Sequence, residues 1–281
     1  MNAEHTALSE RGRRWFTALT GTSAQTSTDP MHPASVLVAD TKLADETARF
    51  LCVVPNPQAR FPMASQGEVG LEEAYALAAS VREVIDTHKS GKRRPIIAIV
   101  DLKSQAYGRR EETAAIYHAA ATATDAYATA RMLGHPVIAL VVGQALSGGF
   151  LTHGYQANRI LAFDDPGVVI HAMHKEAAAR VTRRTVAELD KLAETIIPLS
   201  YKIEDFAKLG ILHELIKVKN AEQPQVDEIK LVSERLATAV ADARQGELDL
   251  SVRWTSPSAK SSRHATIAAR EAMFVQWDNI K

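Results

Sequence analysis

The sequence predicts an α/β fold built on a largely parallel β-sheet with helices on both of its faces. Residues 93–101 (RRPIIAIVD) and 135–143 (HPVIALVVG) each carry a continuous apolar run, which is typical of strands that are buried on both sides. Each run is followed by a segment with helical character. Buried strands that alternate with helices need a helical layer on each face of their sheet.

The segments that flank these strands are expected to be extensions of one domain. Residues 8–19 look like a short basic helix, and a polar stretch rich in Thr, Ser and Pro follows. The ordered domain is expected to start near Ser35, with β-type runs at 35–40 and 48–54. We therefore predict three parts: residues 1–34, a helix and flexible loop; 35–220, the α/β domain; and 221–281, a helical extension that caps the domain or meets another subunit.

Helices are predicted between and after the strands. Residues 71–88 place apolar side chains on one helical stripe, with acidic residues in the first turn. Residues 111–133 form a long alanine-rich helix, and the chain turns helical again after residue 143. The remaining predicted elements are strands at 159–163, 168–171 and 215–217, helices ending near 193 and 209, and C-terminal helices at 231–244 and 266–277.

Composition excludes several kinds of partner and site. The chain has 33 basic and 33 acidic residues, so no net field attracts nucleic acid or an anionic membrane. No apolar run approaches the ~18–20 residues of a membrane span, and no signal peptide is evident. The single cysteine, Cys52, lies in an apolar run where a buried thiol is expected. These features favour a cytoplasmic protein.

A candidate site lies in GQALSGG, residues 143–149, where an apolar strand turns into a helix. Backbone N–H groups at the start of a helix have no partner within it, and without a Cβ on Gly148 or Gly149 a substrate oxygen could approach them. This arrangement suits an oxyanion hole. For an isolated Ser-Gly-Gly, a tight strand-to-helix turn or close helix packing is the better explanation.

A wider pattern favours the oxyanion hole. A strand ending in Asp101, the loop QAYG at 105–108, a long helix, the strand HPVIALVVG and then GQALSGG follow one another. Residues 94–218 thereby resemble the crotonase-type fold of the carboxyltransferase subunits of acyl-CoA carboxylases. The segments RGRRWFTALTG, FPMASQGEVGLEEAY and VVGQALSGGF resemble most the gamma subunits of biotin-independent malonate decarboxylase.

The resemblance implies a heteromeric enzyme whose beta and gamma subunits together decarboxylate a malonyl thioester. The thioester is carried on an acyl carrier protein with a dephospho-CoA-type arm, which a separate transferase subunit loads. The chain itself would bind no cofactor, and biotin is not required. Loss of carbon dioxide leaves an enolate, and backbone donors can stabilise its oxygen. We expect Gly148 N–H as the first donor and an N–H near Ala106, Tyr107 or Gly108 as the second. Which subunit holds the thioester oxygen stays open.

Departures from related patterns narrow the chemistry. Enoyl hydratases place a glutamate three positions after the donor glycine, whereas this chain has Leu151, which cannot move a proton. Gln105 stands where carboxyltransferases usually have glycine, which puts the second donor in doubt. Arg109, beside the loop, could bind a carboxylate or phosphate through its forked donors.

Two other interpretations compete with a catalytic gamma subunit. Ser147 and His171 resemble in order and type the serine and histidine of caseinolytic-type peptidases; they could instead bind the carboxylate or supply a proton to the enolate. The chain could also be a structural subunit that completes the partner's pocket. His171, His174 and Glu176 have helical metal-ligand spacing, but a strand-to-helix change near Met173 would separate them, so no metal is predicted.

Overall fold

The computed structural model describes residues 9–22 and 32–278. Within these ranges the strands form one seven-stranded sheet in the order β1-β2-β3-β4-β5-β7, and β6 also pairs with β4. Of the strand pairs in this described part, only β1–β2 is antiparallel, which confirms the largely parallel sheet. The strands are β1 (Val36–Leu43), β2 (Glu46–Val53), β3 (Ile96–Leu102), β4 (Val137–Leu146), β5 (Arg159–Phe163), β6 (Val169–His171) and β7 (Glu214–Ile216).

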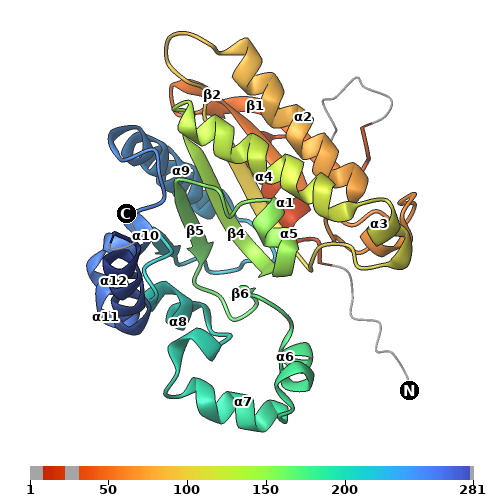
Figure 1. Ribbon diagram of the computed structural model, residues 1–281. Coiled ribbons are helices and arrows are strands. Elements are labelled where there is room, and N and C mark those ends of the chain that lie inside the picture. Colours follow the sequence, from red (N-terminus) through yellow and green to blue (C-terminus); the bar gives the residue numbers. More distant parts are fainter. Residues whose placement is uncertain (1–8, 23–31, 279–281) are drawn as a thin grey trace.

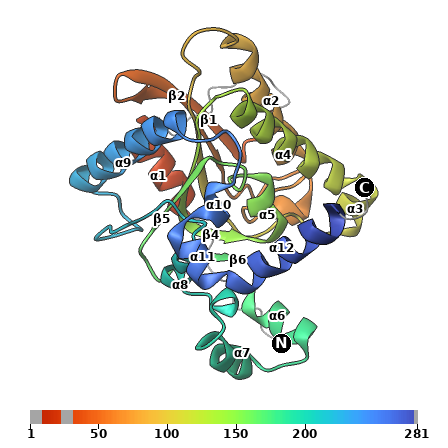
Figure 2. The same cartoon turned by 60° about the vertical axis from the view of Figure 1, so that its left-hand side comes forward.

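Helices cover both faces of the sheet, as Figures 1 and 2 show from two directions. On one face lie α2 (Leu71–Thr87) and α4 (Ile116–Met132), which pack against each other. On the other face lie α1 (Arg11–Thr20) and α9 (Val226–Gln245). Every residue of β3 is buried between these layers, because a parallel strand with helices on both sides has no solvent face.

The N-terminal helix α1 is fixed to the strand ends that border the candidate site. Asp101, near the end of β3, accepts hydrogen bonds from Ser9 Oγ (2.5 Å) and from Gly12 N–H (3.1 Å) with one carboxylate oxygen. Its other oxygen accepts from Gln144 N–H at 3.1 Å. The ring of Trp15 meets Phe163 edge to face at 4.6 Å. The aspartate of the sequence motif therefore holds α1 and β4 in place.

Several predicted elements have different bounds in the structure. The long helix expected at 111–133 is two helices, α3 (Arg109–Thr113) and α4, because Ala115 adopts a left-handed backbone with φ of 60°. The helix expected to end near 193 is also two, α6 (Lys175–Thr182) and α7 (Val186–Ala193). Strand β4 continues to Leu146 rather than ending at Gly143, because β6 pairs with its last three residues.

The C-terminal part is helical, as predicted. The remaining helices are α5 (Ser147–Thr152), α8 (Ile203–Lys208), α10 (Val252–Thr255), α11 (Pro257–Ser262) and α12 (His264–Asp278), with short 3-10 turns at Pro62–Ala64 and Ile197–Leu199. No described residue of α12 is buried, and Met273, Phe274, Val275 and Trp277 are all more than 60% exposed. Among the residues described, no helix is long and apolar enough to cross a membrane.

The first predicted part, residues 1–34, lies partly outside the described residues. The expected helix start at residue 8 and most of the polar stretch at 21–33 lie there, while the helix itself is present as α1. The described part of the domain begins its first strand at Val36, one residue after the predicted start. The division at residue 220 falls between β7 and α9.

Candidate active site

The chain reverses sharply where β4 meets α5. Leu146 is extended, and the next residue, Ser147, has a left-handed backbone with φ of 56°. A non-glycine residue in this region costs about 1 kcal/mol or more, so the surrounding contacts must hold it. One such contact is the hydrogen bond that Ser147 Oγ donates to the Ala172 carbonyl at 2.8 Å. Strand β6, which contributes His171 opposite Leu146, brings that carbonyl alongside the turn.

Gly149 is required by packing against the protein's own backbone. A Cβ built there would lie 2.4 Å from the Ser104 carbonyl oxygen and 2.6 Å from its carbon. Neither atom can rotate away as a side chain can, so the loop after β3 and the start of α5 approach this closely only with glycine. The close approach predicted at Gly149 is present, but Ser104 makes it rather than a substrate.

The N–H of Gly148, the expected first oxyanion donor, is already occupied. It donates to Gln105 Oε1 at 2.7 Å, and a Cβ on Gly148 would lie 2.9 Å from the same carboxamide. The expectation that this N–H lies open to a substrate oxygen is therefore wrong for the structure described. The side-chain carbonyl of Gln105 accepts the hydrogen bond that was expected to go to a substrate oxygen.

In the loop 105–108, two of the three expected backbone N–H donors are open. Ala106 N–H donates to the Val69 carbonyl at 2.9 Å, so Ala106 is not an open donor, contrary to one of the three expectations. The N–H groups of Tyr107 and Gly108 make no hydrogen bond with any residue in the described ranges. Gly108 caps α3 in an extended conformation. The open donors of this loop are thus Tyr107 and Gly108.

The loop 105–108 and the turn 147–149, the two walls of the site, meet at the hydroxyl of Ser147. Tyr107, half exposed, places its hydroxyl 3.2 Å from Ser147 Oγ. Because the Ser147 proton is directed at the Ala172 carbonyl, the Tyr107 hydroxyl is the donor to Ser147 Oγ. The loop 105–108 and the turn 147–149 therefore form one surface, as the sequence predicts.

His171 belongs to the same surface but makes no hydrogen bond with Ser147. Its Nδ1–H donates to the Met173 carbonyl at 3.1 Å, and its ring stacks on Tyr201 with centroids 3.9 Å apart. Partial burial lowers the pKa of His171, so the ring is neutral near pH 7 with a basic Nε2. Since the hydroxyl of Ser147 is committed to a backbone carbonyl, the serine–histidine pair of a peptidase is not formed.

The remaining candidates are His174 and Arg109. His171 ends β6 while His174 caps the start of α6 in an extended conformation, so the helical spacing needed for a shared metal does not arise. Arg109 is the first residue of α3 and is exposed. Arg110 instead lies 5.7 Å from the ring centroid of Phe61.

Comparisons with known proteins show the family to which this chain belongs. The family model of the malonate decarboxylase gamma subunit matches residues 64–275, a range that contains the turn, the loop and His171. The chain belongs to the malonate decarboxylase gamma subunit family. The structure is similar to a chain of a Pseudomonas malonate decarboxylase hetero-tetramer solved in complex with coenzyme A, with 47% identity and a TM-score of 0.87, covering 93% of this chain and 99% of that one.

Further relatives share the fold of this chain or part of its sequence. A Pseudomonas MdcD-MdcE hetero-dimer matches at 44% identity and a TM-score of 0.85, covering 95% of this chain and 99% of that one. The malonyl-S-ACP:biotin-protein carboxyltransferase MADD of Malonomonas rubra is 35% identical over 162 residues, and the match spans only 56% of each protein. The transcarboxylase 12S structure, at 18% identity, a TM-score of 0.56 and coverage of 76% of this chain and 36% of that one, shares the fold, which confirms the carboxyltransferase-like, crotonase-type architecture.

Two residues near the site were not predicted from the sequence as functional candidates. Gln105 attracted attention only as a departure from glycine, and Asp101 only as part of a motif, yet both contact the site's backbone directly. His153, in contrast, is fully buried and structural: Nε2–H donates to the Ile99 carbonyl at 3.0 Å and Nδ1 accepts from the Tyr127 hydroxyl at 2.8 Å. Burial lowers the pKa of His153 to about 4.

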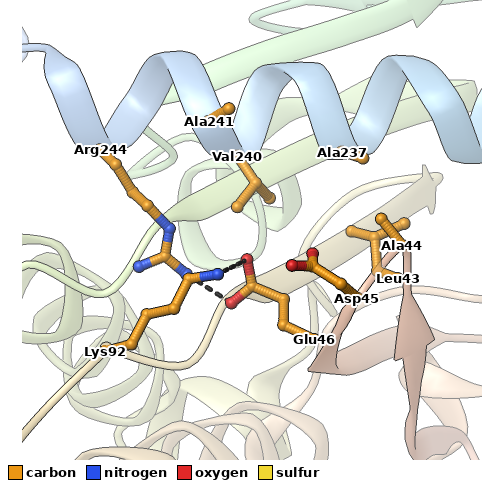
Figure 3. Close-up of a pocket in the computed structure, with 9 residues that line it drawn as sticks. All are labelled: Leu43, Ala44, Asp45, Glu46, Lys92, Ala237, Val240, Ala241 and Arg244. Atoms are coloured by element: carbon orange, nitrogen blue, oxygen red, sulfur yellow. Dashed lines mark hydrogen bonds and ion pairs between the residues drawn. The ribbon is translucent and has the colours of Figure 1, made fainter.

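Of two pockets on the surface, one lies far from the turn at Ser147 and the other lies next to the candidate site. One, of about 170 Å³, lies between the β1–β2 turn and α9, where Glu46 pairs with Lys92 and Arg244 (Figure 3). It is at the end of the sheet where the parallel strands begin, opposite the candidate site. The other, of about 750 Å³, is polar and includes Tyr201 in its lining. Through the His171–Tyr201 stack it adjoins the candidate site.

Proposed function

We propose that this chain acts in the decarboxylation of a malonyl thioester carried on an acyl carrier protein, giving an acetyl thioester and carbon dioxide. The observation that carries the proposal is the surface formed by Gln105, Tyr107 and Ser147–Gly148, within a member of the malonate decarboxylase gamma subunit family. It presents hydrogen-bond donors at the carboxyl ends of parallel strands, where ligands of α/β folds bind.

The reaction needs charge stabilisation and one proton. As the bond between the carboxylate and Cα breaks, its electron pair moves into an enolate whose charge lies on the thioester oxygen, and carbon dioxide leaves. A preorganised donor to that oxygen lowers the barrier by roughly 3–4 kcal/mol. The enolate carbon then takes a proton. Burial lowers the pKa of His171, so near pH 7 its Nε2 carries no proton to give, and we propose that the exposed Tyr107 hydroxyl relays a proton from solvent.

Substrate delivery is proposed to follow the biotin-independent scheme. The carrier protein would bear a dephospho-CoA-type arm loaded by a transferase subunit, and this chain would bind neither biotin nor another cofactor. The relative from Malonomonas rubra is named as a carboxyltransferase to a biotin protein, so the distinction needs a direct test. Carbon dioxide release that avidin does not inhibit would support the biotin-independent scheme, and inhibition would contradict it. We also propose a cytoplasmic location.

A second subunit is proposed to complete the active site. A solved relative is described as a hetero-dimer of MdcD and MdcE, and we propose that this chain pairs in the same way with a beta subunit. The exposed apolar side chains of α12 supply a candidate contact, since large apolar groups gathered on a surface helix mark interaction sites. In this proposal residues 35–220 carry the chemistry and 221–281 mainly carry the interface.

The experiment that tests the function is reconstitution. The chain would be co-purified with its beta subunit and supplied with malonyl-loaded carrier protein, and carbon dioxide release would be compared with that of the beta subunit alone. Release that depends on both subunits supports the proposal. Equal release by the beta subunit alone would show that this chain takes no part in the reaction.

A further inference from the structure

The carboxamide of Gln105 is held as a fixed polar group between the two walls of the site. Gly148 N–H donates to its Oε1 at 2.7 Å. Because an N–H group requires an acceptor opposite it, the atom facing Gly148 is the carbonyl oxygen, and Nε2 occupies the other arm. All three atoms of the carboxamide lie 2.9–3.3 Å from the position that a Gly148 Cβ would take. The flat group therefore lies directly against the glycine.

The backbone beneath this side chain is also fixed. Val69 N–H donates to the Ser104 carbonyl at 3.0 Å, and Ala106 N–H donates to the Val69 carbonyl at 2.9 Å. These two bonds hold both neighbours of Gln105 in a short parallel bridge. The Ser104 carbonyl in turn packs against Gly149. Little freedom remains for the side chain, so its second amide arm has a defined direction.

The Nε2 group of Gln105 is available to a ligand. It makes no hydrogen bond with any of the residues at 9–22 or 32–278, and it is not among the buried side-chain atoms that lack a partner. Gln105 itself is partly exposed. Two N–H donors are therefore free beside Ser147 and Tyr107, at the place where a backbone donor is expected.

We propose that Gln105 Nε2, rather than the Gly148 N–H, donates the hydrogen bond to the thioester oxygen as the enolate forms. Gly148 N–H acts behind it by holding and polarising the carboxamide. This inference rests on the proposed decarboxylation and assigns its oxyanion donor to a side chain. A carbonyl that accepts a hydrogen bond withdraws electrons from its own nitrogen, and hydrogen bonds joined in such a chain strengthen one another.

The geometry distinguishes this relay from a simple plug. If Gln105 only blocked Gly148 N–H, its removal would expose the backbone donor and raise activity. If Gln105 relays the hydrogen bond, the substrate oxygen lies beyond the carboxamide from Gly148 N–H, and removal of the carboxamide leaves that oxygen without its donor. The two roles thus predict changes in kcat of opposite sign.

The test uses the complex of this chain with its beta subunit and malonyl-loaded carrier protein. Gln105→Glu keeps an oxygen for Gly148 N–H but removes both N–H donors, and we expect kcat to fall roughly 100-fold, the usual effect of losing one oxyanion donor. Gln105→Gly is expected to lower kcat as well. Gln58→Glu, an exposed change of the same chemistry elsewhere on the chain, is the control and should retain full activity.

The pH profile adds a readout that a purely structural role would not change. The carboxyl group introduced by Gln105→Glu is ionised near pH 7 and gains an O–H donor when it is protonated. The kcat of this variant relative to wild type should therefore rise as the pH falls from about 7 to 5. Wild-type kcat for Gln105→Glu, a flat ratio across pH, or a gain for Gln105→Gly would each overturn the relay. An inactive wild-type complex would instead refute the proposed function.

Discussion

Substituting alanine at the two adjacent glycines should separate a packing role from a role in the site. In Gly149→Ala the new methyl carbon would lie 2.4 Å from the Ser104 carbonyl oxygen, well inside ordinary van der Waals contact. Because the clash is with backbone in a loop held by two hydrogen bonds, the loop must move as a unit. Overpacking of this kind costs about 2–3 kcal/mol.

Gly148→Ala is the matched control, because its methyl carbon would meet only the end of the Gln105 side chain, at 2.9 Å. A flexible side chain can shift, so we expect a loss of about 1 kcal/mol or less, together with lower activity as the Gly148–Gln105 hydrogen bond is disturbed. Urea denaturation of both variants measures the difference in unfolding free energy. Equal stability losses, or a larger loss for Gly148→Ala, would refute the packing argument.

Three further predictions concern stability and assembly. Burial lowers the pKa of His153 from 6.5 to about 4. Between these two pH values the unfolded chain binds a proton at this residue and the folded chain does not. The free energy of unfolding is therefore unaffected by His153 above pH 6.5 and decreases as the pH falls toward 4. At pH 5 the loss is about 2 kcal/mol, and His153→Gln should remove about that much from the pH 7-to-5 difference in urea denaturation, whereas an unchanged difference would contradict the assignment. Asp101→Ala should lower the free energy of unfolding by about 2–4 kcal/mol, because it leaves the N–H groups of Gly12 and Gln144 without their acceptor. Asp101→Asn keeps one acceptor and should lower it less, whereas a loss below about 1 kcal/mol for the alanine variant would contradict this role. Phe274→Asp combined with Trp277→Asp should abolish co-purification with the beta subunit while the chain stays folded, because both side chains are exposed on α12; an intact complex would place the interface elsewhere.

The sheet and its order of elements could be predicted because local patterns determine them. The buried strands β3 and β4 carry long apolar runs, and the segment between them is rich in alanine, which favours a helix. The ends of elements were harder to predict. Strand β4 extends to Leu146 because β6 pairs with its last three residues and Leu102 of β3 pairs with Ala145. The break at Ala115 depends on a left-handed backbone that no Gly or Pro in the sequence indicates.

The site was predicted in its location but not in its contacts. The turn at Ser147 and the loop at Tyr107 do meet, since both follow neighbouring parallel strands. The partner of Gly148 N–H lies 43 residues away in the sequence, and its position depends on one side-chain conformation that no local pattern encodes. The only signal was Gln105 itself, a long polar residue where the resemblance to carboxyltransferases leads one to expect glycine.

The register between β4 and β6 also determines that Ser147 and His171 do not form a hydrogen-bonded pair. Pairing of β4 with β6 sets His171 beside Leu146, and the next carbonyl along, that of Ala172, takes the Ser147 proton. Residue types and order alone suggest a peptidase, but that hydrogen bond and the stacking of His171 on Tyr201 leave the serine without a base. Family membership and geometry therefore point away from hydrolysis.

The central claim is that this chain contributes chemistry where Gly148 N–H holds the Gln105 carboxamide, and does not merely complete a partner's pocket. The most direct measurement is carbon dioxide release from malonyl-loaded carrier protein by the assembled complex carrying Gly148→Val, in which the branched side chain displaces the Gln105 carboxamide and blocks the site. Loss of roughly 100-fold in kcat with normal assembly is the predicted result. Undiminished release by that assembled variant would contradict the account and leave this chain a structural subunit.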